Sequence, residues 1–179
     1  RPFDYVRVKK QETYEDHARR VSQYRQELET LRSIIGERLT QINNLTIEDI
    51  GERTRLAREM YEESQRFFID HDEGRGLLWR LIRECHDELG GTPDGCEYAL
   101  IGLGSLALGM MTPWSDLEFG ILIGKEREEY KEYFRNLTKL LQIKVINYFA
   151  ESQLRGLGVE SLNDFRSGEE ERNWFWDDV

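Results

Sequence analysis

The sequence predicts an α+β protein in which a block of helices precedes a small mixed sheet flanked by further helices. Two observations lead to this fold class. Up to residue 91 the apolar residues follow helical spacing only, and the first strand pattern comes after a run of helix breakers at 90–95. Beyond that run, strand and helix patterns alternate. We therefore expect a helical N-terminal region over residues 1–91 and an α+β core over residues 92–179.

Three helices are expected in the N-terminal region, at about 10–39, 47–69 and 76–89. Gly36 interrupts the first pattern late, and Thr46 is a candidate N-cap for the second helix. Gly90 and Gly91 end the third. In the first helix the apolar residues recur three, four and seven positions apart, as expected for one buried face: Tyr14, Val21, Tyr24, Leu28, Leu31 and Ile35.

In the core, apolar runs predict strands at 98–101, 116–123 and 143–149. A short helix is expected at 105–111, ended by Pro113, and a longer one at 125–141. For residues 150–179 we expect a short helix and a loop. The order of elements is therefore strand, turn and short helix, strand, helix, strand.

Composition narrows the classes of partner. The chain has 179 residues and a net charge of −10, which disfavours long nucleic acid as a partner. No apolar run approaches the roughly 20 residues of a membrane span, so no membrane association is expected. Cys85 and Cys96 are too few for a disulfide framework, and we expect free thiols and a cytoplasmic location. The chain starts at Arg1 without a methionine and stops in an aromatic run, so we expect a piece of a larger multidomain protein.

The segment from Gly104 to Glu118 carries the clearest functional pattern. Asp116 and Glu118 stand two positions apart in an apolar strand pattern, so both side chains point to one side while Leu117 points into the core. The Gly104-Ser105 turn can offer backbone N–H groups to phosphate oxygens. Two carboxylates beside such a turn suit a site for Mg²⁺ and a nucleotide.

Gly104-Ser105, ten intervening residues and then Asp116-Leu117-Glu118 resemble the motif of the nucleotidyltransferase (DNA polymerase β-like) superfamily. The segment is also similar to the N-terminal domain of PII-protein uridylyltransferases. The resemblance implies a nucleotidyltransferase-type sheet and Mg²⁺-dependent transfer of a nucleoside monophosphate from a nucleoside triphosphate to a protein or small-molecule hydroxyl. It also implies that Asp116 and Glu118 hold two Mg²⁺ ions, and that Gly104 and Ser105 contact the β- and γ-phosphates.

The sequence departs from this motif in two ways. The family's third acid would fall near Asn147, whose amide cannot act as a base or offset metal charge. The nearest substitute is Glu151, and the more distant ones are Asp164, Asp177 and Asp178. Leu108 and Met110 stand where the small enzymes usually carry Arg and Glu. Three functions therefore stay open: an active nucleotidyltransferase, a catalytically inactive module of the same fold that binds a nucleotide or a protein, and a helical assembly domain.

The other polar residues favour structural roles. His17, His71 and His86 show no metal-ligand spacing, and we expect them at the surface or in helix packing. Ser115 is expected to brace the turn before the acids rather than to act as a nucleophile. Four arginines could contact phosphate but are interleaved with glutamates, which favours ion pairs within the helix: Arg53, Arg55, Arg58 and Arg66. Three aromatic residues are expected in a core or an interface: Trp174, Phe175 and Trp176.

Overall fold

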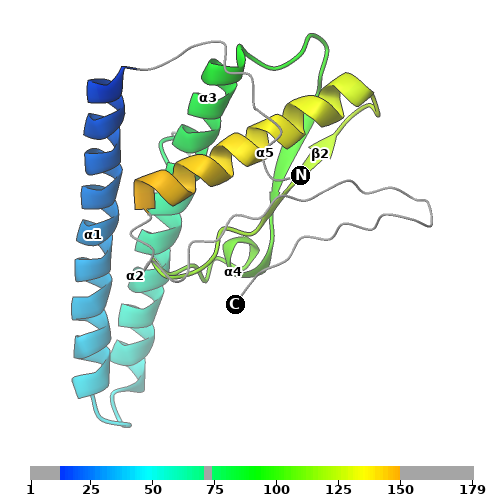
Figure 1. The fold of residues 1–179 in the computed structure, drawn as a ribbon. Coiled ribbons are helices and arrows are strands. Elements are labelled where there is room, and N and C mark those ends of the chain that lie inside the picture. Colours follow the sequence, from blue (N-terminus) through cyan, green and yellow to red (C-terminus); the bar gives the residue numbers. More distant parts are fainter. Residues whose placement is uncertain (1–12, 71–73, 150–179) are drawn as a thin grey trace.

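The computed structural model describes residues 13–70 and 74–149 of the chain. These residues form an α+β fold with a helical block at the N-terminal side, as the sequence predicted (Figure 1). None of the helices in these two ranges has both the length and the apolar composition that a membrane span requires. In chain order the elements are α1 (Tyr14–Asn44), α2 (Ile50–Phe68), α3 (Leu77–Leu89), β1 (Tyr98–Gly102), α4 (Gly104–Ala107), β2 (Phe119–Ile123) and α5 (Glu128–Phe149).

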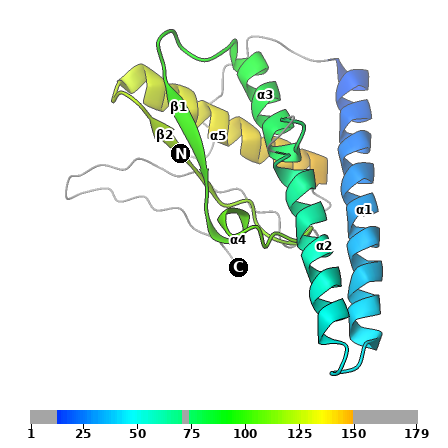
Figure 2. The same ribbon diagram turned by 180° about the vertical axis from the view of Figure 1, so that it is seen from behind.

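Helices α1 and α2 form an antiparallel hairpin, and α3 continues beyond the end of α2 (Figures 1 and 2). α1 starts at the N-cap Thr13, whose side chain accepts a hydrogen bond from the Asp16 N–H. It extends five residues past the end that the sequence predicted, since Gly36 does not break it. A glycine inside a helix costs about 1 kcal/mol, and packing of the buried face outweighs that cost. This face is Tyr24, Leu28, Leu31 and Ile35.

α3 ends where its glycines predict. Gly90 adopts a left-handed conformation with φ of 84°, and the Gly91 N–H donates to the His86 carbonyl oxygen at 2.7 Å. These contacts satisfy the last carbonyl groups of the helix. The chain then turns into β1.

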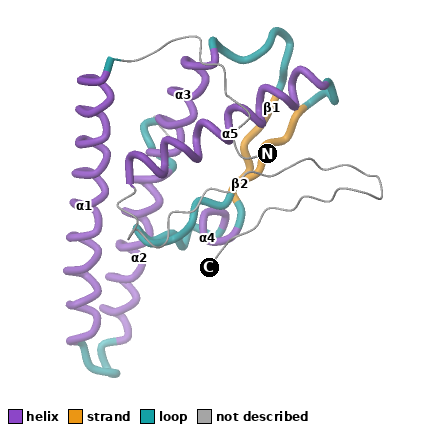
Figure 3. Tube along the Cα trace, in the orientation of Figure 1, coloured by secondary structure: helices purple, strands orange, loops and turns teal. Residues whose placement is uncertain are grey.

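The sheet of the described residues is a two-stranded antiparallel ladder of β1 and β2 (Figure 3). Its register pairs Tyr98 with Ile123 at one end and Gly102 with Phe119 at the other. Because the strands are antiparallel, the end of β1 meets the start of β2. The connection between them carries α4, which is shorter than the helix expected at 105–111. The topology therefore brings the Gly104-Ser105 turn next to the residues before Phe119.

The third strand predicted at 143–149 does not form, and that prediction was wrong: α5 runs through the whole segment. The sheet is consequently antiparallel rather than mixed within the described residues. β-branched residues at 143, 145 and 146 favour a strand locally, but no glycine or proline separates them from the preceding helix. The buried positions also stay in helical phase through the segment: Tyr130, Phe134, Leu137, Leu141 and Val145.

One hydrophobic cluster contains residues of both predicted regions. It includes Leu28 of α1, Leu81 of α3, Leu137 of α5 and Leu117 from the loop before β2. The helical block therefore packs directly against the elements that carry the sequence motif. The boundary near residue 91 stays a prediction.

A buried charge network joins α1, α3 and α5. Lys144 of α5 is only 5% exposed, and its Nζ lies 3.3 Å from Glu84 Oε2 and 2.5 Å from Glu88 Oε1. Arg20 contacts Glu84 at 3.0 Å, and the Tyr24 hydroxyl donates to it at 2.5 Å. Burial by itself raises the pKa of Glu84, but Tyr24, Lys144 and Arg20 outweigh this effect and hold the pKa below its ordinary value. These contacts give the buried Lys144 ammonium two carboxylate partners on α3.

Candidate functional site

Asp116 and Glu118 lie in the loop that leads into β2. The sequence predicted a strand from residue 116, but the ladder begins at Phe119, so the two acids precede the strand. Burial nevertheless alternates as expected: Leu117 and Phe119 are buried, whereas Asp116 and Glu118 are half-buried. The prediction that Leu117 and Phe119 enter the core is confirmed. Because the intervening residue is buried, both acids are placed away from the core.

Gly104 and Glu118 are in direct contact. The Leu103 N–H donates to the Glu118 carbonyl oxygen at 2.9 Å, which continues the β1–β2 pairing by one step. Gly104 has a φ of +49°, and a Cβ atom added there would lie 1.5 Å from Glu118 Oε2. The positive φ favours glycine, and a side chain at this position would have to displace the end of the Glu118 side chain. The fold brings the glycine and the second acid of the motif together.

Ser105 follows in α4, a single turn whose backbone is bonded within itself. The Ala107 N–H donates to the Leu103 carbonyl at 3.1 Å, and the Met110 N–H donates to the Ser105 carbonyl at 2.9 Å. Leu106 is buried and anchors this turn in the core. Ser105 itself is half-buried. The turn is thus fixed on its inner side and reaches solvent beside Glu118.

Ser115 braces the turn before Asp116, as predicted. Its hydroxyl oxygen accepts from the Thr112 N–H at 2.9 Å and lies 3.0 Å from the Thr112 hydroxyl. The Ser115 N–H in turn donates to the Thr112 carbonyl at 3.0 Å. With both groups engaged inside the turn, Ser115 has a structural role.

A third carboxylate does not join Asp116 and Glu118 in the described part of the chain. Among residues 13–70 and 74–149 no group of three or more His, Cys, Asp or Glu side chains could hold a metal ion. Asn147 lies in α5 and not on a strand beside β2. The other candidates fall outside the described residues: Glu151, Asp164, Asp177 and Asp178. Within the described ranges, Asp116 and Glu118 are therefore the two motif acids that the structure places.

The two positions that depart from the motif are exposed. Leu108 is 73% exposed and Met110 is 53% exposed, and both follow the Gly104-Ser105 turn closely. Trp114, in the turn before Asp116, is also exposed. The segment between the Gly104-Ser105 turn and Asp116 thus exposes three large apolar side chains.

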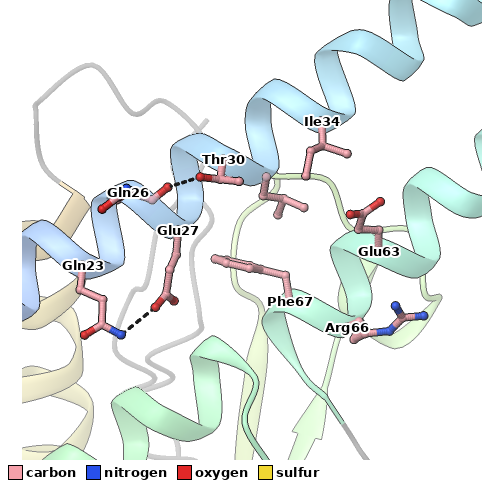
Figure 4. A pocket seen from close by; sticks show the side chains of 9 residues that line it. Gln23, Gln26, Glu27, Thr30, Ile34, Glu63, Arg66 and Phe67 are labelled. Carbon is pink, nitrogen blue, oxygen red and sulfur yellow. Dashed lines mark hydrogen bonds between the residues drawn. The ribbon is translucent and has the colours of Figure 1, made fainter.

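A groove of about 520 Å³ between α1 and α2 lies apart from this site (Figure 4). Glu63 and Phe67 of α2 and Glu27 and Ile34 of α1 are among its lining residues, and none of the predicted site residues is. Its acids have partners: Glu27 pairs with Arg80 at 2.6 Å, and Glu63 pairs with Arg38 at 2.6 Å. The groove does not extend the candidate site.

Among the arginines of α2, Arg55 behaves as the alternation with glutamate predicted. Arg55 pairs with Glu52 at 2.6 Å and with Glu59 one turn further on. Ion pairs within the helix are thus confirmed for the central arginine of the stripe. His71 and the aromatic residues Trp174, Phe175 and Trp176 lie outside the described residues.

His86 connects three elements. Its Nδ1 lies 2.5 Å from the Tyr133 hydroxyl of α5, and its Nε2 lies 2.8 Å from the Tyr98 hydroxyl of β1. Burial lowers the pKa of His86. The neighbouring Cys85 is a free, buried thiol whose pKa burial raises to about 12, so it stays protonated and unreactive. These residues hold the helices and the sheet together, as helix-packing residues do.

Two residues that contact the motif were missed by sequence analysis. Arg32 of α1 donates from Nε and Nη2 to the Pro113 carbonyl oxygen at 3.3 and 3.1 Å. Gln65 of α2 donates to the Leu106 carbonyl oxygen at 3.3 Å. Both partners are backbone carbonyls far away in the sequence, so no residue pattern could have pointed to them.

Comparison of the chain with models of protein families, with curated proteins and with solved structures found no match.

Proposed function

We propose that this chain is a Mg²⁺-dependent nucleotidyltransferase-type domain that binds a nucleoside triphosphate at Gly104, Ser105, Asp116 and Glu118. The observation that carries the proposal is the contact of the Glu118 carboxylate with Gly104, whose positive φ favours glycine and whose lack of a Cβ leaves room for the carboxylate. It joins the two halves of a motif that are separated by more than ten residues. The antiparallel pairing of β1 and β2 supports the same arrangement.

The residues suit a divalent cation. Asp116 and Glu118 are half-buried carboxylates that alternate with core residues, and hard oxygen ligands of this kind are those that Mg²⁺ takes. A bound Mg²⁺ would supply positive charge to the phosphates and polarise the attacking hydroxyl. On the protein side, Asp116 and Glu118 would hold the ion, and the Gly104-Ser105 turn would orient the phosphates.

In the active form of this proposal, the reaction moves a nucleoside monophosphate to a hydroxyl of a protein or a small molecule and releases pyrophosphate. The remaining acid would come from one of the residues beyond α5, with Glu151 the nearest in sequence. The free thiols Cys85 and Cys96 agree with the cytoplasmic location that we expect for such an enzyme.

A binding module without catalysis is the second candidate, and two observations favour it. The described residues offer two carboxylates at the site and no cluster of three ligands. The exposed side chains of Leu108 and Met110 cannot make the charge-assisted contacts to phosphate that Arg provides, each worth about 1.5–3 kcal/mol. Such a module would bind a nucleotide, or a protein, on the same surface.

Calorimetric titration with ATP, UTP, CTP and GTP, each with and without Mg²⁺, tests the proposal. We expect binding of at least one nucleotide that depends on Mg²⁺ and is lost in the double variant Asp116→Asn, Glu118→Gln. Release of pyrophosphate in the presence of Mg²⁺ would distinguish the enzyme from the binding module. If no nucleotide binds under any of these conditions, the nucleotide site is refuted.

A further inference from the structure

The N-terminal helical hairpin contacts both halves of the candidate site. On α1, Arg32 is largely buried, with its side chain 11% exposed, and two of its nitrogens donate to the Pro113 carbonyl oxygen. Its guanidinium carbon lies 5.9 Å from the centre of the Trp114 ring, and its Nη1 lies 3.5 Å from Glu29. Pro113 precedes Asp116 by three residues. Arg32 therefore ties the segment leading to the first acid to α1.

The second contact comes from α2. Gln65 donates to the carbonyl oxygen of Leu106, which lies in the same turn as Gly104 and Ser105. The loops around α4 run beside α2 in Figure 3. One helix of the hairpin thus contacts the glycine-serine turn, and the other contacts the acid segment.

The 112–115 turn is held in part by burial, since Pro113 within it and Leu117 after it are buried. Hydrogen bonds between Thr112 and Ser115 fix its shape. The Arg32 guanidinium also fixes its place, because two donors from one rigid planar group meet a single carbonyl oxygen. Glu118 is already held by the ladder through its carbonyl oxygen. The position of Asp116 relative to Glu118 therefore depends on the buried Leu117 between them and on how Arg32 holds the 112–115 turn.

We propose that Arg32 is a positioning residue of the candidate site: by holding the Pro113 carbonyl, it keeps Asp116 beside Glu118 and so sets the affinity for the divalent cation. This inference rests on the proposed function. The inference gives the helical block a role in the site. α1 contacts the segment that leads to Asp116, and α2 contacts the Gly104-Ser105 turn, and these two segments must converge on one ion.

The test compares the full chain with the variants Arg32→Ala, Arg32→Lys and Arg38→Ala. Arg38 is the matched control, since it is also on α1 and pairs with Glu63 of α2 at 2.6 Å. Hydrogen exchange of the amides of residues 112–118 reports the anchoring. Mn²⁺ binding, followed by electron paramagnetic resonance, reports the metal site. Thermal unfolding shows that each variant is folded.

Loss of hydrogen bonds from a charged group predicts that Arg32→Ala raises exchange in 112–118 about tenfold and weakens Mn²⁺ binding by a similar factor. Arg38→Ala should leave both within about twofold of the wild type, since its lost ion pair is partly exposed. Arg32→Lys should fall between, because an ammonium group offers only a point contact to the carbonyl. If Arg32→Ala does not fold, Arg32→Lys takes its place in the comparison with the wild type and Arg38→Ala.

If the wild type binds Mn²⁺ and the Arg32 variants show the same exchange and the same Mn²⁺ affinity, the role of Arg32 is overturned. The proposed function would not be affected by that result. Absence of Mn²⁺ binding in the wild type would instead contradict the proposed function, and with it the effect of Arg32 on affinity. The exchange measurement then still decides whether Arg32 holds the turn.

Discussion

Glu84 and Glu88 on α3 and Asp116 and Glu118 before β2 are both pairs of acids close together in the sequence, but the fold treats them differently. The α3 pair meets Lys144 and Arg20, and a tyrosine hydroxyl completes the network. At the second pair, one carboxylate lies against the Cα of Gly104, and both acids reach solvent. Paired charges at the first place hold three helices together. At the second place the two half-buried acids flank the buried Leu117, and it is there that we propose an ion is bound.

For locating a functional site, the contact of Glu118 with Gly104 is more informative than the ion pairs of Glu84 and Glu88. In the network of Glu84 and Glu88, the chain itself supplies the cations that pair with the buried acids, so no external ligand is needed to account for them. At the second pair, Gly104 has a positive φ, and the Glu118 carboxylate lies where a side chain on residue 104 would point. This difference is why we place function at Asp116 and Glu118 and stability at Glu84 and Lys144.

The largest expected effect on stability comes from Lys144→Met. Removing the cation leaves two acids close together in a largely buried place, which should lower the free energy of unfolding by about 3 kcal/mol. Lys131→Met is the matched control on α5, since Lys131 pairs with the exposed Glu126, and should cost less than about 1 kcal/mol. Urea denaturation measures both, and Mn²⁺ affinity should be unchanged in both. A loss of Mn²⁺ binding in Lys144→Met, with the variant folded, would contradict the separation of the two regions.

Gly104→Ala should weaken metal binding while having a smaller effect on stability. The new Cβ displaces the Glu118 carboxylate, and we expect Mn²⁺ affinity to fall about tenfold or more. Left-handed backbone at alanine should also cost about 1–2 kcal/mol. Gly109→Ala separates the loss of metal binding from the loss of stability. Gly109 also has a positive φ, +67°, but a Cβ added there would have no other atom within 4 Å. This variant should show the same loss of stability with metal binding retained; equal affinities in the two variants would remove Gly104 from the site.

The smallest expected effect is a pH dependence of the stability, which arises from His86 where α3 contacts β1. The pKa of His86 lies below its unfolded value of 6.5 because of burial. The unfolded chain then takes up the proton first, so the stabilisation is complete above that value and is lost as the pH falls below it. Urea midpoints measured between about pH 7.5 and pH 5.5 should decrease, and less steeply in His86→Gln. A slope in His86→Gln equal to that of the wild type would exclude this source.

Local patterns in the sequence were sufficient for most elements. The helices, both strands of the ladder and the burial of Leu117 and Phe119 follow from apolar spacing and from breakers such as Gly90. The prediction failed at 143–149, where β-branched residues suggested a strand. There the charge network around Lys144, which depends on residues of two other helices, favours the helix.

The sequence predicted the residues of the candidate site, but not the residues of α1 and α2 that contact its backbone. The spacing of Gly104 and Glu118 along the chain suggested that they meet, and the antiparallel ladder brings them together. Arg32 and Gln65 act through backbone carbonyls of Pro113 and Leu106, and such contacts leave no trace in residue types. The third acid stays a prediction, because the candidates that the sequence offers lie outside the described residues: Glu151, Asp164, Asp177 and Asp178.

Crystals of the protein grown with Mn²⁺ and a nucleoside triphosphate give the most direct test of the central claim. We predict an anomalous scattering peak within direct ligand distance, about 2.1–2.2 Å, of carboxylate oxygens from both Asp116 and Glu118. The triphosphate should lie beside the Gly104-Ser105 turn. An ordered metal–nucleotide complex bound elsewhere, with Asp116 and Glu118 contacting neither ion nor phosphate, would contradict the account.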